Sequence, residues 1–182
     1  QDGEGRTSTW KDVEALYNYE KNKALRKAPK LTTMHVRPTH SKKMKVSLAA
    51  QVLSRSTSAA METLGEELSP TAKNTAAHLA MFNAMFDFFN SRNLKECGTR
   101  KPVIRQLWEE QKSSLDRWFL FVQSISFKGA RQSKRTLPFK EGWLISLAAV
   151  KCLLSDVLEE DEVSFVLTRR INQDAVEVST CT

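Results

Sequence analysis

Apolar residues recur every three to four positions over most of this chain, which is the spacing of one buried helix face. The predicted helices are residues 10–23, 41–64, 70–90, 103–124 and 142–158. Ser41 is placed to cap the second, and Gly65 is a residue type that ends helices. Residues 28–40, with two prolines, read as an extended connector, and residues 163–167 as a short strand or connector. No strand–helix alternation indicates a doubly wound sheet, so the predicted fold is mainly α.

Length and composition predict one domain or one large fragment. The chain has 182 residues, of which 41% are hydrophobic and 27% charged, ordinary values for a globular protein. No apolar run approaches the ~20 residues that span a bilayer, so no membrane partner is expected. The first residue is glutamine and no signal peptide follows it, which suggests a partial sequence.

Positive charge is unevenly distributed. The net charge is +7, and Lys and Arg gather in residues 21–30, 37–45 and 128–140. Such runs favour contact with a polyanion, either nucleic acid or nucleotide phosphate. A solvated basic face without a ligand is the other interpretation.

Familiar glycine loops and catalytic signatures are missing. The sequence contains no G-x-x-x-x-G-K-[ST], G-x-G-x-x-G, G-x-S-x-G or H-E-x-x-H motif. Its three cysteines and three histidines have no zinc-ligand spacing. A nucleotide bound here would therefore be held without a P-loop.

Two carboxylates near the end of the chain share a helical spacing. Asp174 and Glu177 are three residues apart and follow Arg169 and Arg170. Two acids beside two arginines can build a divalent-metal or phosphate site, provided that other elements supply further acids.

Five segments, in order, resemble the P-element-type transposases, including their THAP-linked relatives. They are Ala28-Pro29-Lys30-Leu31-Thr32, residues 44–54 (Met-Lys-Val-Ser-Leu-Ala-Ala-Gln-Val-Leu-Ser), residues 82–92 (Phe-Asn-x-x-Phe-Asp-x-x-Asn-Ser-Arg), Gly142-Trp143-Leu144-Ile145, and residues 167–174 (Leu-Thr-Arg-Arg-Ile-Asn-Gln-Asp). The resemblance implies the helical GTP-binding insertion domain of an RNase H-like transposase, with only the edges of the RNase H-like domain present. It places a helical segment after the second catalytic aspartate at 1–27, the insertion domain at 28–170 and a truncated return at 171–182.

The resemblance also implies a guanine-nucleotide site in the first half of the chain. By motif position, Lys30 and Lys45 would approach the phosphates, and Val46 would line the pocket. Ser54 would add a polar contact, and Asn83 would orient ribose or base.

Four further residues have implied roles, three at the nucleotide and one at the catalytic centre. Phe86 would stack on the base, while Asp87 would accept hydrogen bonds from guanine N1–H and its amine. Asp174 would contact GTP or its Mg²⁺, and Glu177 would be the third catalytic acid and a metal ligand. From spacing alone, Phe86 lies on an apolar stripe with Leu79 and is a core residue.

Alternatives follow from what the chain does not contain. The family's first two catalytic aspartates and its zinc-binding THAP domain have no match here, so DNA cleavage by this chain alone is not expected. The implied role is GTP-dependent positioning of transposon DNA in the nucleus, with homo-oligomerisation through regions missing here. After Glu177 the sequence departs from the family, which suggests truncation, a decayed element or a gene-model boundary. A domesticated DNA-binding or scaffold protein without nucleotide binding is the other hypothesis.

Overall fold

Helices provide nearly all the regular structure, which confirms the predicted fold class. The computed structural model describes residues 3, 5–43, 45–127, 137–160 and 162–171. The chain divides into two units, residues 5–83 and residues 84–182 with the first four, and the dividing point falls inside one helix. Each unit is described by itself. No helix in the described ranges is long and apolar enough to cross a membrane.

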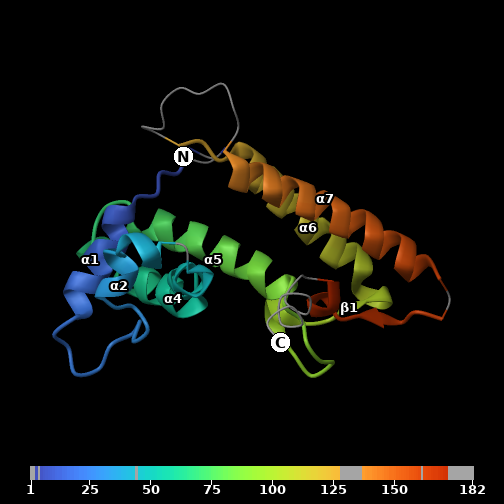
Figure 1. The fold of residues 1–182 in the computed structure, drawn as a ribbon, viewed down its shortest axis with the longest axis horizontal. Helices are drawn as coiled ribbons and strands as arrows, with labels where there is room; N and C mark the ends of the chain where they lie inside the picture. Colours follow the sequence, from blue (N-terminus) through green and yellow to red (C-terminus); the bar gives the residue numbers. More distant parts are fainter. Residues whose placement is uncertain (1–2, 4, 44, 128–136, 161, 172–182) are drawn as a thin grey trace. The chain divides into compact units, whose positions relative to one another are not determined.

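Residues 5–83 form a cluster of short helices around one apolar core (Figure 1). The helices are α1 (Trp10–Glu20), α2 (Thr33–Val36), α3 (Val46–Val52), α4 (Arg55–Leu64) and the first part of α5 (Ala72–Phe88). Single 3-10 turns cover His40–Lys42 and Gly65–Glu67. The core contains Val13, Leu16, Leu31, Val36, Val52, Met61, Leu64 and Leu79, each at most 7% exposed. The predicted helical face of residues 10–23 is confirmed for Val13 and Leu16, whereas Trp10 is 49% exposed.

Two acidic residues of α1 face inward and are satisfied there. Asp12, 1% exposed, accepts hydrogen bonds from the hydroxyls of Ser69 (2.6 Å), Thr71 (2.9 Å) and Thr75. Glu20, 3% exposed, accepts from the backbone N–H groups of residues 27 and 28 at 2.8 and 2.9 Å. A buried carboxylate is costly unless it is hydrogen-bonded, and both are.

The prediction of one helix over residues 41–64 is wrong, because the chain breaks between α3 and α4. Ser54 is in extended backbone geometry and caps α4, its hydroxyl accepting from the Thr57 N–H. The Thr57 hydroxyl in turn donates to the Gln51 carbonyl at 3.2 Å. Gly65, with φ +38°, ends α4 as predicted.

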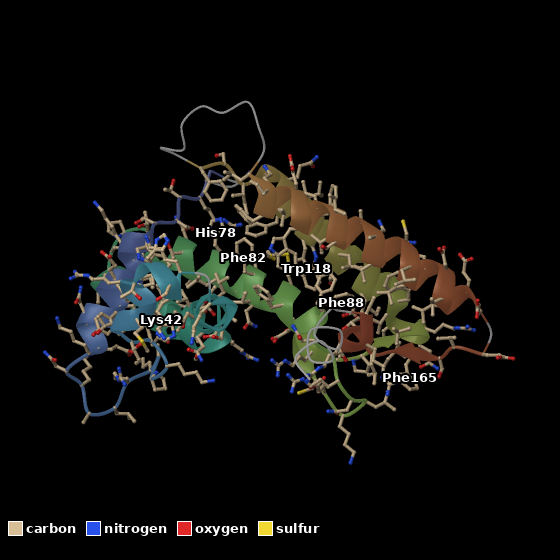
Figure 2. All side chains as sticks on the ribbon, viewed as in Figure 1. Lys42, His78, Phe82, Phe88, Trp118 and Phe165 are labelled. Carbon is tan, nitrogen blue, oxygen red and sulfur yellow. The ribbon has the colours of Figure 1, made fainter. Side chains whose placement is uncertain are left out.

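The second unit is built on two long helices that lie side by side, α6 (Trp108–Ser124) and α7 (Pro138–Glu159) (Figure 1). Trp118 of α6 packs edge-to-face on Phe88, with ring centroids 5.5 Å apart (both labelled in Figure 2). Trp108 and Trp118 are buried as predicted, at 8% and 7% exposed.

A small antiparallel sheet joins the ends of this helical pair. β1 (Val103–Ile104) pairs with β2 (Phe165–Val166), Val103 opposite Val166. α6 therefore begins at Trp108, and the predicted helix start at residue 103 is wrong, because Val103 and Ile104 pair with a strand about sixty positions later. The predicted strand at 163–167 is confirmed. Short 3-10 turns cover Gly98–Arg100, Arg105–Leu107 and Thr168–Ile171.

Candidate functional site

Lys30 and Lys45 are exposed cations in the unit of residues 5–83. Lys30 lies in the turn before Leu31, and Lys45 immediately precedes α3. Within the described part of the chain, neither ammonium group is engaged by a carboxylate or a hydrogen-bond acceptor. Both can therefore donate to a phosphate oxygen without first breaking an ion pair.

Val46 presents an apolar side chain to solvent at the first position of α3. It is 73% exposed, although valine is usually buried. Lining a ligand pocket would account for this exposure, and so would its place at a helix end.

The structure brings Ser54 and Asn83 together at the start of α4. The Ser54 hydroxyl accepts from the Thr57 N–H (3.4 Å), and the Asn83 side-chain oxygen accepts from the Arg55 N–H (3.1 Å). Two of the unsatisfied N–H groups at a helix start are thus capped by side chains. The apolar spacing of residues 41–64 does not predict this capping role, and Ser54 itself, a residue type favoured at helix starts, was the available signal.

Phe86 is half-buried in the second unit. Its ring packs edge-to-face on Trp143, with centroids 5.3 Å apart and an interplanar angle of 82°. Phe89 contacts the same tryptophan at 5.9 Å. The core interpretation of Phe86 therefore holds in part, and its partial exposure leaves ring surface for a stacking contact.

Asp87 receives a donor on each of its two oxygens. Arg100 Nε lies 3.0 Å from Oδ1, and the Thr99 hydroxyl donates to Oδ2 at 3.1 Å. The Asp87 side chain is 21% exposed and that of Arg100 is 50% exposed. Thr99 and Arg100 belong to a 3-10 turn that starts at Gly98, whose φ of +66° favours glycine. No local sequence pattern predicts Thr99 and Arg100 as partners of Asp87.

The predicted metal ligands Asp174 and Glu177 lie outside the described residues. In the described ranges, no three His, Cys, Asp or Glu side chains gather closely enough to hold a metal ion. Of the remaining candidates, Lys30, Lys45, Val46, Ser54 and Asn83 belong to residues 5–83. Phe86 and Asp87 belong to the second unit.

Comparisons with known proteins agree with one another. Residues 1–102 match a family model described as a TNP-like, GTP-binding insertion domain. The chain is 30% identical over 155 residues to the transposable element P transposase of Drosophila melanogaster, covering 81% of this chain and 20% of that protein. A solved structure, the Drosophila P element transposase strand transfer complex, aligns with 27% identity and a TM-score of 0.81 over 96% of this chain and 39% of that one. The chain thus spans about one fifth of the length of the curated relative that it matches.

Proposed function

The chain belongs to the TNP-like GTP-binding insertion domain family of P-element-type transposases, and from this membership we propose that it binds GTP through the residues that match the family's motifs. Asp87 would read the guanine base and Phe86 would stack on it. Lys30 and Lys45 would contact the phosphates, with Val46 lining the pocket.

The contacts of Asp87 are the observation that carries this proposal. Its two carboxylate oxygens already accept two neighbouring donors, from Arg100 and Thr99. Guanine offers the same kind of paired donor edge, N1–H beside the exocyclic amine, whereas adenine has no such pair. A carboxylate that exchanges these two donors for a base edge therefore favours guanine over adenine, and charge-assisted hydrogen bonds are the strong ones.

The exposure of the two lysines supports the phosphate end of the site. An ammonium group is a sound point-charge partner for a phosphate, as lysines at other phosphate sites show. Mg²⁺ would neutralise phosphate charge when bound. Asp174 would contact GTP or its Mg²⁺, and Glu177 would serve as metal ligand and third catalytic acid of the complete transposase.

The role in DNA positioning follows from the family and from the charge of the chain. We propose that the bound nucleotide helps to position transposon DNA in the nucleus, within a longer protein. That protein would contain an RNase H-like domain interrupted by residues 28–170, a THAP domain, and regions through which it forms a homo-oligomer. By itself the chain would not cleave DNA.

Competition binding tests the guanine site. Labelled GTP should bind, be displaced by GDP but not by ATP, and lose affinity in Asp87→Ala. Asp116→Ala is the matched control, since Asp116 is also paired with a cation in the same unit, Lys151 at 2.5 Å. Nucleotide at ~millimolar concentration detects binding free energies of about −4 kcal/mol. No preference for guanine over adenine nucleotide at this concentration would refute the proposal.

A scaffold or DNA-binding protein without nucleotide is the second candidate. It is favoured by the capping contacts of Ser54 and Asn83, which give both residues a structural reason to be present. In that case labelled GTP would not bind, while DNA binding would persist.

A further inference from the structure

Residues 17–43, called the basic segment below, contain eight Lys or Arg and a single acidic residue, Glu20. The Glu20 carboxylate is 3% exposed and bonded to the backbone N–H groups of Lys27 and Ala28. The one negative charge of this segment is therefore turned inward. Most of its cations are exposed, so the outer surface of the segment is strongly positive.

A cavity of about 230 Å³ opens in the basic segment between α1 and α2. Its lining residues are Tyr17, Asn18, Lys21, Thr33, Val36 and Arg37. Two cations, Lys21 from α1 and Arg37 just after α2, thus contribute to one hollow. In the described ranges, no carboxylate is paired with either of them.

Hydrogen bonds hold the walls of this cavity in place. The Tyr17 hydroxyl and the Thr33 hydroxyl are 2.7 Å apart, which joins α1 to α2. Trp10 Nε1 donates to the Val36 carbonyl at 3.3 Å, a second link between the same helices. Lys21 Nζ donates to the Asn18 side-chain oxygen at 3.2 Å, which fixes the ammonium group at the rim. The polar groups are therefore arranged before any ligand arrives.

This set of groups matches the chemistry of a phosphodiester. A guanidinium and an ammonium can both donate to the oxygens of one singly charged phosphodiester, and the Tyr17–Thr33 hydroxyl pair, which uses one proton between its members, has a second proton left to donate. The cavity also lies within a longer run of cations, including Lys23, Lys27, Lys42 (labelled in Figure 2) and Lys43. A free phosphate would need only the cavity, whereas an extended polyanion would also use these flanking charges.

We propose that the cavity lined by Tyr17, Lys21, Thr33 and Arg37 is a phosphate subsite for the backbone of duplex DNA. It differs from the proposed phosphate contacts of the nucleotide, because neither Lys30 nor Lys45 lines it. This proposal rests on the proposed function only in taking transposon DNA as the partner. Beyond that function, it assigns the surface of the chain that contacts the DNA backbone.

Salt-dependent DNA binding by the full chain tests this subsite. The probe is a short fluorescein-labelled duplex of arbitrary sequence, titrated between ~50 and ~200 mM salt. The double variant Lys21→Gln/Arg37→Gln should weaken binding about tenfold and flatten the plot of log affinity against log salt by about one. The matched control is Lys112→Gln/Arg117→Gln, which removes the same charge from α6. Lys21 and Arg37 are exposed, so the fold should survive, and circular dichroism checks this.

The outcomes separate this proposal from the nucleotide site. A loss of duplex affinity confined to the cavity variant supports the proposal. This holds where GTP binds both variants as tightly as the wild-type chain, and also where GTP does not bind the wild-type chain at all. Equal losses in both double variants would overturn it, because general charge would then be responsible. Displacement of the duplex by tripolyphosphate or GTP at the wild-type cavity, lost in the cavity variant, would assign the cavity to a nucleotide and also overturn it. So would failure of the wild-type chain to bind the duplex at low salt.

Discussion

Replacing Arg100 by alanine should strengthen GTP binding. Arg100 Nε and the Thr99 hydroxyl occupy the two oxygens of Asp87, the same oxygens that guanine would need. The base edge must therefore displace or rearrange these donors when it binds. Removing Arg100 takes away one competitor and leaves the carboxylate in place.

The structure limits the size of this gain. The Arg100 side chain is 50% exposed, and exposed ion pairs stabilise by only ~0.2–1 kcal/mol because water screens them. Removing Arg100 can thus make the binding free energy of GTP more favourable by at most about 1 kcal/mol. This corresponds to an affinity gain of about fivefold or less. Affinity for ATP, which has no matching donor pair, should not rise.

Fluorescence anisotropy with a labelled guanine nucleotide measures the effect directly. Arg92→Ala is the control, because it removes an exposed arginine of the same unit that is not bonded to Asp87. Asp87→Ala should lose the guanine preference in the same assay. A loss of GTP affinity in Arg100→Ala, as large as that in Asp87→Ala, would refute the reasoning, since Arg100 would then bind the nucleotide itself.

Three further changes have defined expectations. Phe86→Ala should weaken GTP binding roughly tenfold, because base stacking on an aromatic ring stabilises by ~1–3 kcal/mol. The control is Phe89→Ala, which removes the other ring that packs on Trp143. Equal GTP titration curves for Phe86→Ala and Phe89→Ala would count against stacking. Asp12→Ala should lower the free energy of unfolding in urea by about 2–4 kcal/mol, since three hydroxyls, of which that of Thr75 is buried, lose a charged acceptor, and a loss below ~0.5 kcal/mol would show that they find other partners. Gly65→Ala should lower the free energy of unfolding by about 1–2 kcal/mol, because φ at this position is +38°, and an unchanged thermal unfolding midpoint would contradict this.

Local periodicity was sufficient for helices whose partners are near in sequence, and it failed where a distant or polar contact decides the backbone. The predicted helices at 10–23, 70–90 and 142–158 match α1, α5 and α7 closely, because a continuous apolar face determines each. The break at Ser54 was missed because the apolar spacing continues through it while side-chain capping favours a new start. Val103 was assigned to a helix because its strand partner, Val166, is remote in sequence.

The chemistry of the site divides in the same way. Motif positions predict Asp87 as a site residue, and no local pattern predicts Thr99 and Arg100 as its partners, because a glycine turn at Gly98 brings them there. Similarly, a basic run is visible in the sequence, but the inward direction of Glu20 is a tertiary fact. The excess of positive charge at the surface is therefore larger than the sequence alone indicates.

The capping role of Ser54 and Asn83 changes how variants there must be interpreted. Both side chains already cap N–H groups at the start of α4, so alanine at either position should cost roughly 0.5–2 kcal/mol of stability whether or not a nucleotide binds. A loss of GTP affinity in Ser54→Ala is then ambiguous by itself. Ser54→Asp resolves this, because aspartate caps helices as well as serine does but brings a negative charge toward a phosphate. Retained stability with lost GTP affinity in Ser54→Asp would place Ser54 beside the phosphates, and retained affinity would leave it a structural cap.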